Sequence, residues 1–165
     1  MHTLVVMSKN SYRENMENLV LASSRKYEKA CYISFSDPYH IVVKMLENVK
    51  VEQEKFIVVD VSGSAKERQT VNKTTYVLPT SDLFNLYLFM RNVIIEEGVK
   101  MLLLDSISAL IYKHNDLNLK GMLTNLLLEV GTHKCDSSIV VFDEHQQHEV
   151  IDHLSPFIGR NVMLY

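Results

Sequence analysis

The sequence predicts an α/β domain of three layers, in which helices cover both faces of a mainly parallel central sheet. Two observations lead to this prediction. Short apolar runs alternate along the chain with longer segments whose apolar residues recur at helical spacing. The run at residues 101–104 is apolar throughout, as expected of a strand that is buried on both faces. Because strands separated by helices usually pair in parallel, the alternation predicts the architecture.

The first part of the chain contains two predicted strands, each followed by a helix. Residues 3–7 form a short apolar run with β-branched side chains, which predicts the first strand. A polar loop separates this strand from a helix over residues 16–23. The second strand is predicted at residues 30–35 and ends at a Ser-Asp-Pro turn, since proline disfavours a helical residue before it. A helical apolar stripe at residues 41–46 predicts the second helix.

The middle of the chain begins with a third predicted strand at residues 55–61. The following stretch, residues 62–75, is strongly polar and is interpreted as a surface loop. Residues 77–79 form either a short extra strand or an extended entry to the next helix. That helix is predicted at residues 83–97, after capping residues, and Gly98 stands where a left-handed residue commonly ends a helix.

The last part of the chain completes the alternation. The fourth strand is the apolar run at residues 101–104, and a helix with one leucine-rich face is predicted at residues 117–130. A fifth strand at residues 138–142, a short helix at 149–154 and a closing strand at 161–165 follow. The sequence therefore predicts a complete layered sheet in a single domain over residues 1–165, a length that is too short for two ordinary domains.

The composition limits the function classes. A net charge of −3 gives no general attraction to nucleic acid, so we expect no nucleic-acid partner. The amino terminus lacks a signal-peptide pattern, and no window reaches the roughly 20 apolar residues of a membrane span. Cys31 and Cys135 each lie beside an apolar run and are expected to be buried thiols rather than a disulfide. We therefore expect a cytoplasmic protein without a membrane partner.

Residues 102–110, LLLDSISAL, resemble the Walker B strand of the RecA/KaiC branch of P-loop ATPases, in which an apolar strand ends in Asp-Ser. The order of elements is similar to that of a KaiC-like domain over nearly the whole chain. This resemblance implies a RecA/KaiC-like fold in which Asp105, followed by Ser106, would hold Mg²⁺ through water. The residues alone leave an alternative, in which Asp105 caps the helix that follows it.

The phosphate-binding loop expected of such a domain differs from its motif. In P-loop proteins the first strand is followed by G-x-x-x-x-G-K-[ST], whose backbone and lysine hold the phosphates. Here Ser8 and Arg13 stand at the glycine positions, Glu14 at the lysine position and Asn15 at the hydroxyl position. A carboxylate repels a triphosphate, and a loop without glycine does not readily wrap one. We therefore expect that this Walker A motif is lost.

The catalytic pair of the resembling family is altered as well. KaiC-like ATPases carry paired glutamates at the end of the second strand, where this chain has Ser36 and Asp37. Both motifs are changed together, which predicts a domain that kept the fold and dropped ATP hydrolysis. We expect no catalytic residues and no cofactor.

Two readings of function follow. The first is a non-catalytic KaiC/RecA-like domain with a regulatory, signalling or assembly role, whose protein partner is another copy or a related ATPase. The alternative is a divergent nucleotide-binding protein or slow ATPase that uses ATP and Mg²⁺. The candidate nucleotide-binding residues for this alternative are Lys9, Ser11, Arg13, Asp105 and Ser106.

Two further clusters are candidate sites. His145 and His148 are three residues apart beside acidic residues, which is the pattern of a metal site in a hydrolase, although a solvated loop and helix is the favoured reading. Lys66, Arg68 and Lys73 lie in the polar stretch after the third strand, and there a solvated loop is favoured over an anion site.

Overall fold

The computed structural model describes residues 1–63, 65–79, 82–114, 117–143 and 148–164. The strands are β1 (His2–Met7), β2 (Ala30–Ser34), β3 (Phe56–Asp60), β4 (Gln69–Asn72), β5 (Thr75–Val77), β6 (Met101–Asp105), β7 (Asp136–Phe142) and β8 (Arg160–Leu164). The helices are α1 (Tyr12–Lys26), α2 (Tyr39–Asn48), α3 (Leu83–Glu96), α4 (Ile107–Lys113), α5 (Leu117–Thr132) and α6 (His148–Leu154). Short 3₁₀ turns at Gln53–Lys55 and Ser155–Phe157 complete the described elements.

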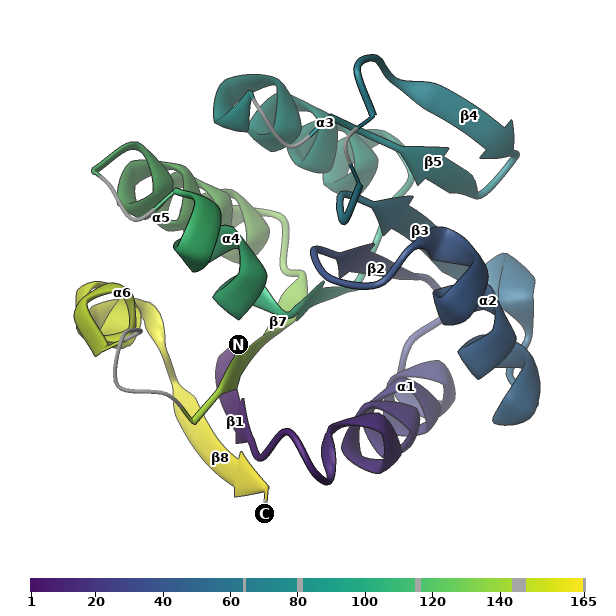
Figure 1. Ribbon diagram of the computed structural model, residues 1–165, viewed down its shortest axis with the longest axis horizontal. Helices are drawn as coiled ribbons and strands as arrows, with labels where there is room; N and C mark the ends of the chain where they lie inside the picture. Colours follow the sequence, from purple (N-terminus) through teal and green to yellow (C-terminus); the bar gives the residue numbers. More distant parts are fainter. Residues whose placement is uncertain (64, 80–81, 115–116, 144–147, 165) are drawn as a thin grey trace.

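An eight-stranded sheet in the order β4-β5-β3-β2-β6-β7-β1-β8 runs through the described part of the chain. Every neighbouring pair is parallel except β4 and β5, which are antiparallel. Helices lie on both sides of the sheet (Figure 1). The predicted three-layer α/β/α class with a mainly parallel sheet is therefore confirmed.

Two apolar cores fill the space between the sheet and its helices. Helices α1 and α2 contribute to one core, and α3, α4, α5 and α6 contribute to the other. Strand β6 contributes side chains to both cores. Leu102 and Leu104 belong to one core, and Met101 and Leu103 belong to the other. Burial on both faces is the physical reason that this strand is an unbroken apolar run.

One helix is not predicted by the periodicity of the sequence. Helix α4 begins two residues after Asp105, and Ile107, Leu110 and Ile111 are buried in it. The expected left-handed residue at the end of α3 is present, since Gly98 has a φ of 64°.

The polar stretch after β3 differs from the interpretation of residues 62–75 as a loop. The chain forms an antiparallel hairpin there, β4 and β5, and β5 pairs in parallel with β3. All four residues of β4 are exposed, so neither face of this edge strand needs apolar side chains. Because the strand buries nothing, the alternation that normally reveals a strand is missing.

Both cysteines are buried free thiols, as expected. Burial raises the pKa of Cys135 to about 12, so its thiol is neutral at physiological pH. Among the helices that the structure describes, none combines the length and the apolar character that crossing a membrane requires.

Candidate functional site

Asp105 lies at the carboxyl end of β6 and is fully buried. Strand β6 runs between β2 and β7, and Asp105 is the neighbour of Ser34 in β2. In sheets of this type the ligand crevice lies beyond the carboxyl ends of the strands. The position of Asp105 therefore makes its surroundings the first candidate for a functional site.

Two tyrosine hydroxyls donate hydrogen bonds to the same oxygen of Asp105. The hydroxyl of Tyr12, the first residue of α1, lies 2.6 Å from Asp105 Oδ2. The second donor is the hydroxyl of Tyr32, which is buried in β2. Asp105 does not cap α4, because Ser106 is the N-cap residue and no side chain accepts a capping hydrogen bond there. The alternative reading of Asp105 as a helix cap is therefore wrong.

Burial dominates the electrostatics of this cluster. Desolvation raises the pKa of Asp105 to about 6, although hydrogen bonds from Tyr12 and Tyr32 act in the opposite direction. The charge of Asp37 raises the pKa of Asp105 further. Desolvation and the Asp105 carboxylate raise the pKa of both tyrosines well above the usual 10. At neutral pH the cluster is thus a buried carboxylate with two neutral hydroxyl donors.

The cluster retains unused hydrogen-bonding capacity. Asp105 Oδ1 and Ser106 Oγ are buried, and neither has a hydrogen-bond partner among the described residues. A carboxylate accepts on both oxygens, and its Oδ2 already receives two donors. Any further donor at this site would therefore meet Oδ1.

The loop between β1 and α1 is only four residues long and is closed by its own polar groups. The amide of Asn10 donates to Ser8 Oγ at 3.3 Å, and Asn15 Nδ2 donates to Ser11 Oγ at 3.0 Å. Helix α1 consequently begins at Tyr12, whose ring packs edge-on against Phe142 with centroids 5.2 Å apart. Tyr12 thus stands between the end of β7 and the Asp105 carboxylate.

The predicted nucleotide-binding residues lie in two segments, the end of β6 and the stretch that leads from β1 into α1. Asp105 and Ser106 are buried side by side at the end of β6, and Ser11 is the N-cap residue of α1. Lys9 is exposed, with its Nζ 5.6 Å from the centroid of the Phe142 ring. Arg13 is also exposed.

The remaining predicted residues near the carboxyl ends of the strands are described by their own contacts. The guanidinium of Arg13 pairs with Glu17 one helical turn away at 3.5 Å. Ser36 is exposed after β2, and the amide of Asp37 donates to Ser34 Oγ at 3.0 Å. Of these two residues, Asp37 influences Asp105 through its charge.

The predicted histidine pair cannot be placed as a site. His145 and the side chain of His148 lie outside the described residues, although the backbone of His148 begins α6. Within the described ranges, no group of three or more His, Cys, Asp or Glu side chains is arranged to hold a metal ion.

Sequence reasoning missed both tyrosines of the cluster. Tyr32 lies within a fully buried strand, and a buried tyrosine needs a partner for its hydroxyl. An acidic residue at the end of a neighbouring strand was an available partner. That signal was present in the sequence, but the pairing of β2 with β6 was needed to interpret it.

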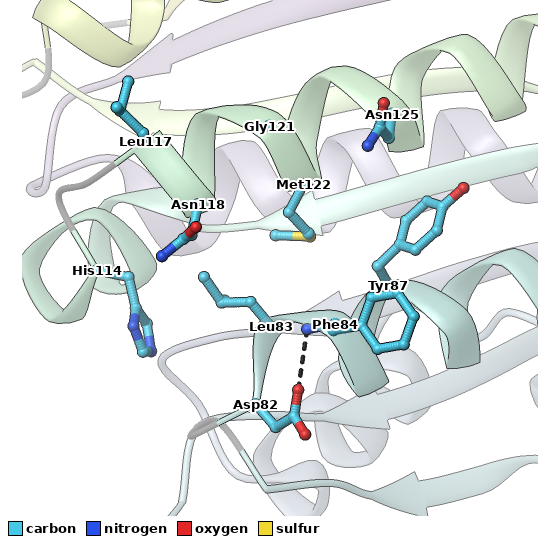
Figure 2. A pocket seen from close by; sticks show the side chains of 10 residues that line it. All are labelled: Asp82, Leu83, Phe84, Tyr87, His114, Leu117, Asn118, Gly121, Met122 and Asn125. Carbon is cyan, nitrogen blue, oxygen red and sulfur yellow. Dashed lines mark hydrogen bonds between the residues drawn. The ribbon is translucent and has the colours of Figure 1, made fainter.

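A cavity of about 640 Å³ lies between α3 and α5, with a lining that does not include Asp105 (Figure 2). Phe84 and Leu117 line it although their side chains are 67% and 82% exposed. Asp82 lies at one end, where its Oδ1 accepts hydrogen bonds from the amides of Phe84 and Asn85 and caps α3. Large exposed apolar side chains beside a cavity are typical of a protein contact surface.

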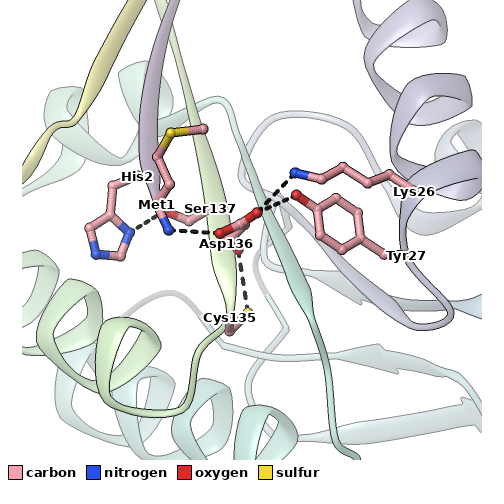
Figure 3. Close-up of polar contacts among 7 residues, drawn as sticks. All are labelled: Met1, His2, Lys26, Tyr27, Cys135, Asp136 and Ser137. Carbon is pink, nitrogen blue, oxygen red and sulfur yellow. Dashed lines mark hydrogen bonds and ion pairs between the residues drawn. The ribbon is translucent and has the colours of Figure 1, made fainter.

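A charged cluster lies at the opposite end of the strands from Asp105, where β7 begins (Figure 3). Asp136 accepts hydrogen bonds from the Met1 ammonium at 2.7 Å, from Lys26 at 3.1 Å and from the Tyr27 hydroxyl. Desolvation raises the pKa of Asp136, but these donors outweigh it and hold the pKa well below its usual range. The cluster joins the end of α1 to the start of β7, which is a structural role.

Comparisons with known proteins identify the fold. No protein-family model matches the sequence, and no curated protein matches it either. Among solved structures, a KaiC-like protein from the hyperthermophilic archaeon Pyrococcus horikoshii is similar, with a TM-score of 0.62 and 10% sequence identity. The similarity covers 86% of this chain but 60% of the archaeal chain. At this identity the comparison establishes a KaiC-like fold and nothing about activity.

Proposed function

We propose that this chain is a non-catalytic domain of KaiC-like fold that acts through protein–protein contacts, in regulation, signalling or assembly. The observation that carries the proposal is the pair of tyrosine hydroxyls on Asp105. In the resembling ATPases this position would serve Mg²⁺ through water. Here its Oδ2 is already occupied by donors from the chain itself.

The loop before α1 supports the same proposal. Residues 8–15 contain no glycine, and Glu14 stands where a lysine would neutralise phosphate. In the structure Lys9 lies over the Phe142 ring and Arg13 pairs with Glu17. Tyr12 donates to Asp105 Oδ2. Each of these contacts favours the non-catalytic reading over the alternative of a slow ATPase.

The cavity between α3 and α5 supports the protein-contact part of the proposal. Its two exposed apolar side chains, Phe84 and Leu117, would be removed from water by a partner. We infer that the partner is another copy of the chain or a related KaiC-like ATPase.

The nucleotide part is tested by thermal unfolding with millimolar ATP or ADP and Mg²⁺. A ligand at 100 times its dissociation constant stabilises the folded state by about 2.7 kcal/mol, which would raise Tm by several degrees in a domain of this size. We expect a change in Tm of less than about 1 °C, since no binding is proposed. A saturable rise of several degrees would refute the proposal and favour the alternative.

The contact part is tested by light scattering of the chain, alone and mixed with KaiC-like ATPases. We expect at least one sample to contain a complex heavier than the 19.0 kDa single chain. Leu117→Lys is expected to weaken that complex at least tenfold, because a charge would enter the apolar contact. Leu128→Lys is the matched control on the same helix, since Leu128 is 54% exposed but does not line the cavity. A single-chain mass in every sample would contradict this part.

A further inference from the structure

Arg68, just before β4, is held against two aromatic rings. Its guanidinium carbon lies 4.8 Å from the ring centroid of Phe89 in α3 and 5.5 Å from that of Tyr76 in β5. The two rings contact each other edge-on, with centroids 5.3 Å apart. A guanidinium over aromatic rings carries five N–H donors in a planar fork. The rings therefore position Arg68 from two separate elements.

This positioned cation has no anionic partner in the described part of the chain. No ion pair or hydrogen bond of the Arg68 guanidinium is formed with any described residue. By contrast, Arg91 on α3 pairs with Glu129 at 3.1 Å. The five N–H donors of Arg68 are thus available to a ligand.

Arg68 lies beside a cavity of about 360 Å³ between α3 and the segment after β5. Leu78 and Leu86 line this cavity and are almost fully buried, so they form an apolar floor. Phe89 adds an aromatic wall, and Asn92 adds an exposed amide one helical turn beyond Phe89. A cavity of this size accepts a small ligand or one amino-acid residue.

We propose that this cavity binds an apolar monocarboxylate, meaning a carboxylate carried next to a branched or aromatic hydrocarbon group. The hydrocarbon group contacts Leu78 and Leu86, and the carboxylate accepts two parallel hydrogen bonds from Arg68. The Asn92 amide lines the same cavity as Phe89 and donates a third hydrogen bond to the carboxylate. One guanidinium matches a single negative charge, whereas a phosphate dianion would need a second cation. This site is independent of the function proposed above, since it shares no residue with the Asp105 cluster.

Binding is tested with N-acetylleucine as the probe, followed by NMR of the ¹⁵N-labelled full chain. We expect saturable shifts in the side-chain signals of Arg68 and Asn92, with a dissociation constant in the millimolar range. N-acetylleucinamide lacks the charge and acetate lacks the hydrocarbon group, so each is expected to bind at least tenfold more weakly. Equal shifts with the amide, or none with N-acetylleucine, would overturn the proposal.

Variants assign the binding to this cavity. Arg68→Gln and Asn92→Asp are each expected to weaken N-acetylleucine binding at least tenfold, the first by removing the cation and the second by repelling the carboxylate. Arg25→Gln is the matched control at an exposed arginine on α1 and is expected to bind as the wild type does. Binding that survives both cavity variants, each checked for folding by its Tm, would refute the assignment.

Two peptides separate the sources of the carboxylate. A pentapeptide ending in leucine with a free carboxylate is compared with the same peptide ending in an amide. Tighter binding of the free acid than of N-acetylleucine assigns the site to the carboxyl terminus of a protein partner. Weaker binding of this peptide assigns it to a small-molecule acid.

Discussion

Replacing Asp105 with asparagine is expected to remove a pH dependence of stability that the wild type shows between pH 8 and pH 4.5. Relative to Asp105→Asn, the free energy of unfolding of the wild type is expected to rise by about 2 kcal/mol over that interval. The comparison with the variant cancels the titration of all other groups that both proteins share.

The sign follows from the raised pKa. Asp105 has a pKa of about 6 in the folded chain against 3.8 for the unperturbed group, so the folded state binds its proton more tightly. Above pH 7 the buried charge therefore costs about 3 kcal/mol. This cost disappears as the pH falls from 6 towards 4. Asparagine carries no proton to gain, and its side-chain oxygen still accepts from the two tyrosines.

The measurement is chemical denaturation of both proteins at several pH values. Parallel stability curves for the wild type and Asp105→Asn would show that Asp105 does not titrate in this range. A wild type that loses stability relative to the variant on acidification would show that its pKa is depressed, which contradicts the dominance of burial.

Tyr32→Phe is expected to lower the free energy of unfolding by about 2 to 3 kcal/mol at pH 8, and by about 1 kcal/mol at pH 4.5. The substitution keeps the buried ring but removes one of the two donors on the Asp105 carboxylate. A hydrogen bond to a buried charged group contributes more than one to a neutral group. The loss is therefore smaller where Asp105 is protonated.

A double-mutant cycle tests this explanation directly. In the Asp105→Asn background, Tyr32→Phe is expected to cost only about 1 kcal/mol at either pH, because no charge remains to be solvated. Tyr27→Phe is the matched control, since Tyr27 donates to the carboxylate of Asp136 at the start of β7. The depressed pKa of Asp136 keeps that group charged from pH 4.5 to 8, so the cost of the control is expected to be constant. Equal pH dependence for Tyr32→Phe and Tyr27→Phe would refute the role of Asp105.

Much of the architecture could be predicted from local patterns. The central strand was recognisable because a strand buried on both faces must be apolar at every position, as Leu102 and Leu103 illustrate. The end of that strand placed Asp105 at the crevice of the sheet. Strand β4 was not recognisable, because an edge strand with exposed residues carries no apolar alternation. The short extra strand considered at residues 77–79 overlaps only the end of β5.

The candidate site depended on contacts that no local pattern records. Tyr12 and Asp105 are 93 residues apart, and they meet only because β1 and β6 are separated by a single strand in the sheet. Arg68 likewise meets Phe89 only after the hairpin folds against α3.

The sequence by itself determined the class of fold, the buried strands and the absence of glycine from the loop after the first strand, because each of these follows from neighbouring residues along the chain. Only the tertiary structure decided that Asp105 accepts from two tyrosines rather than capping a helix, and that two cavities lie along α3. The physical reason is that hydrogen bonds and cavities arise between elements distant in sequence, and strand order in space decides which of them meet.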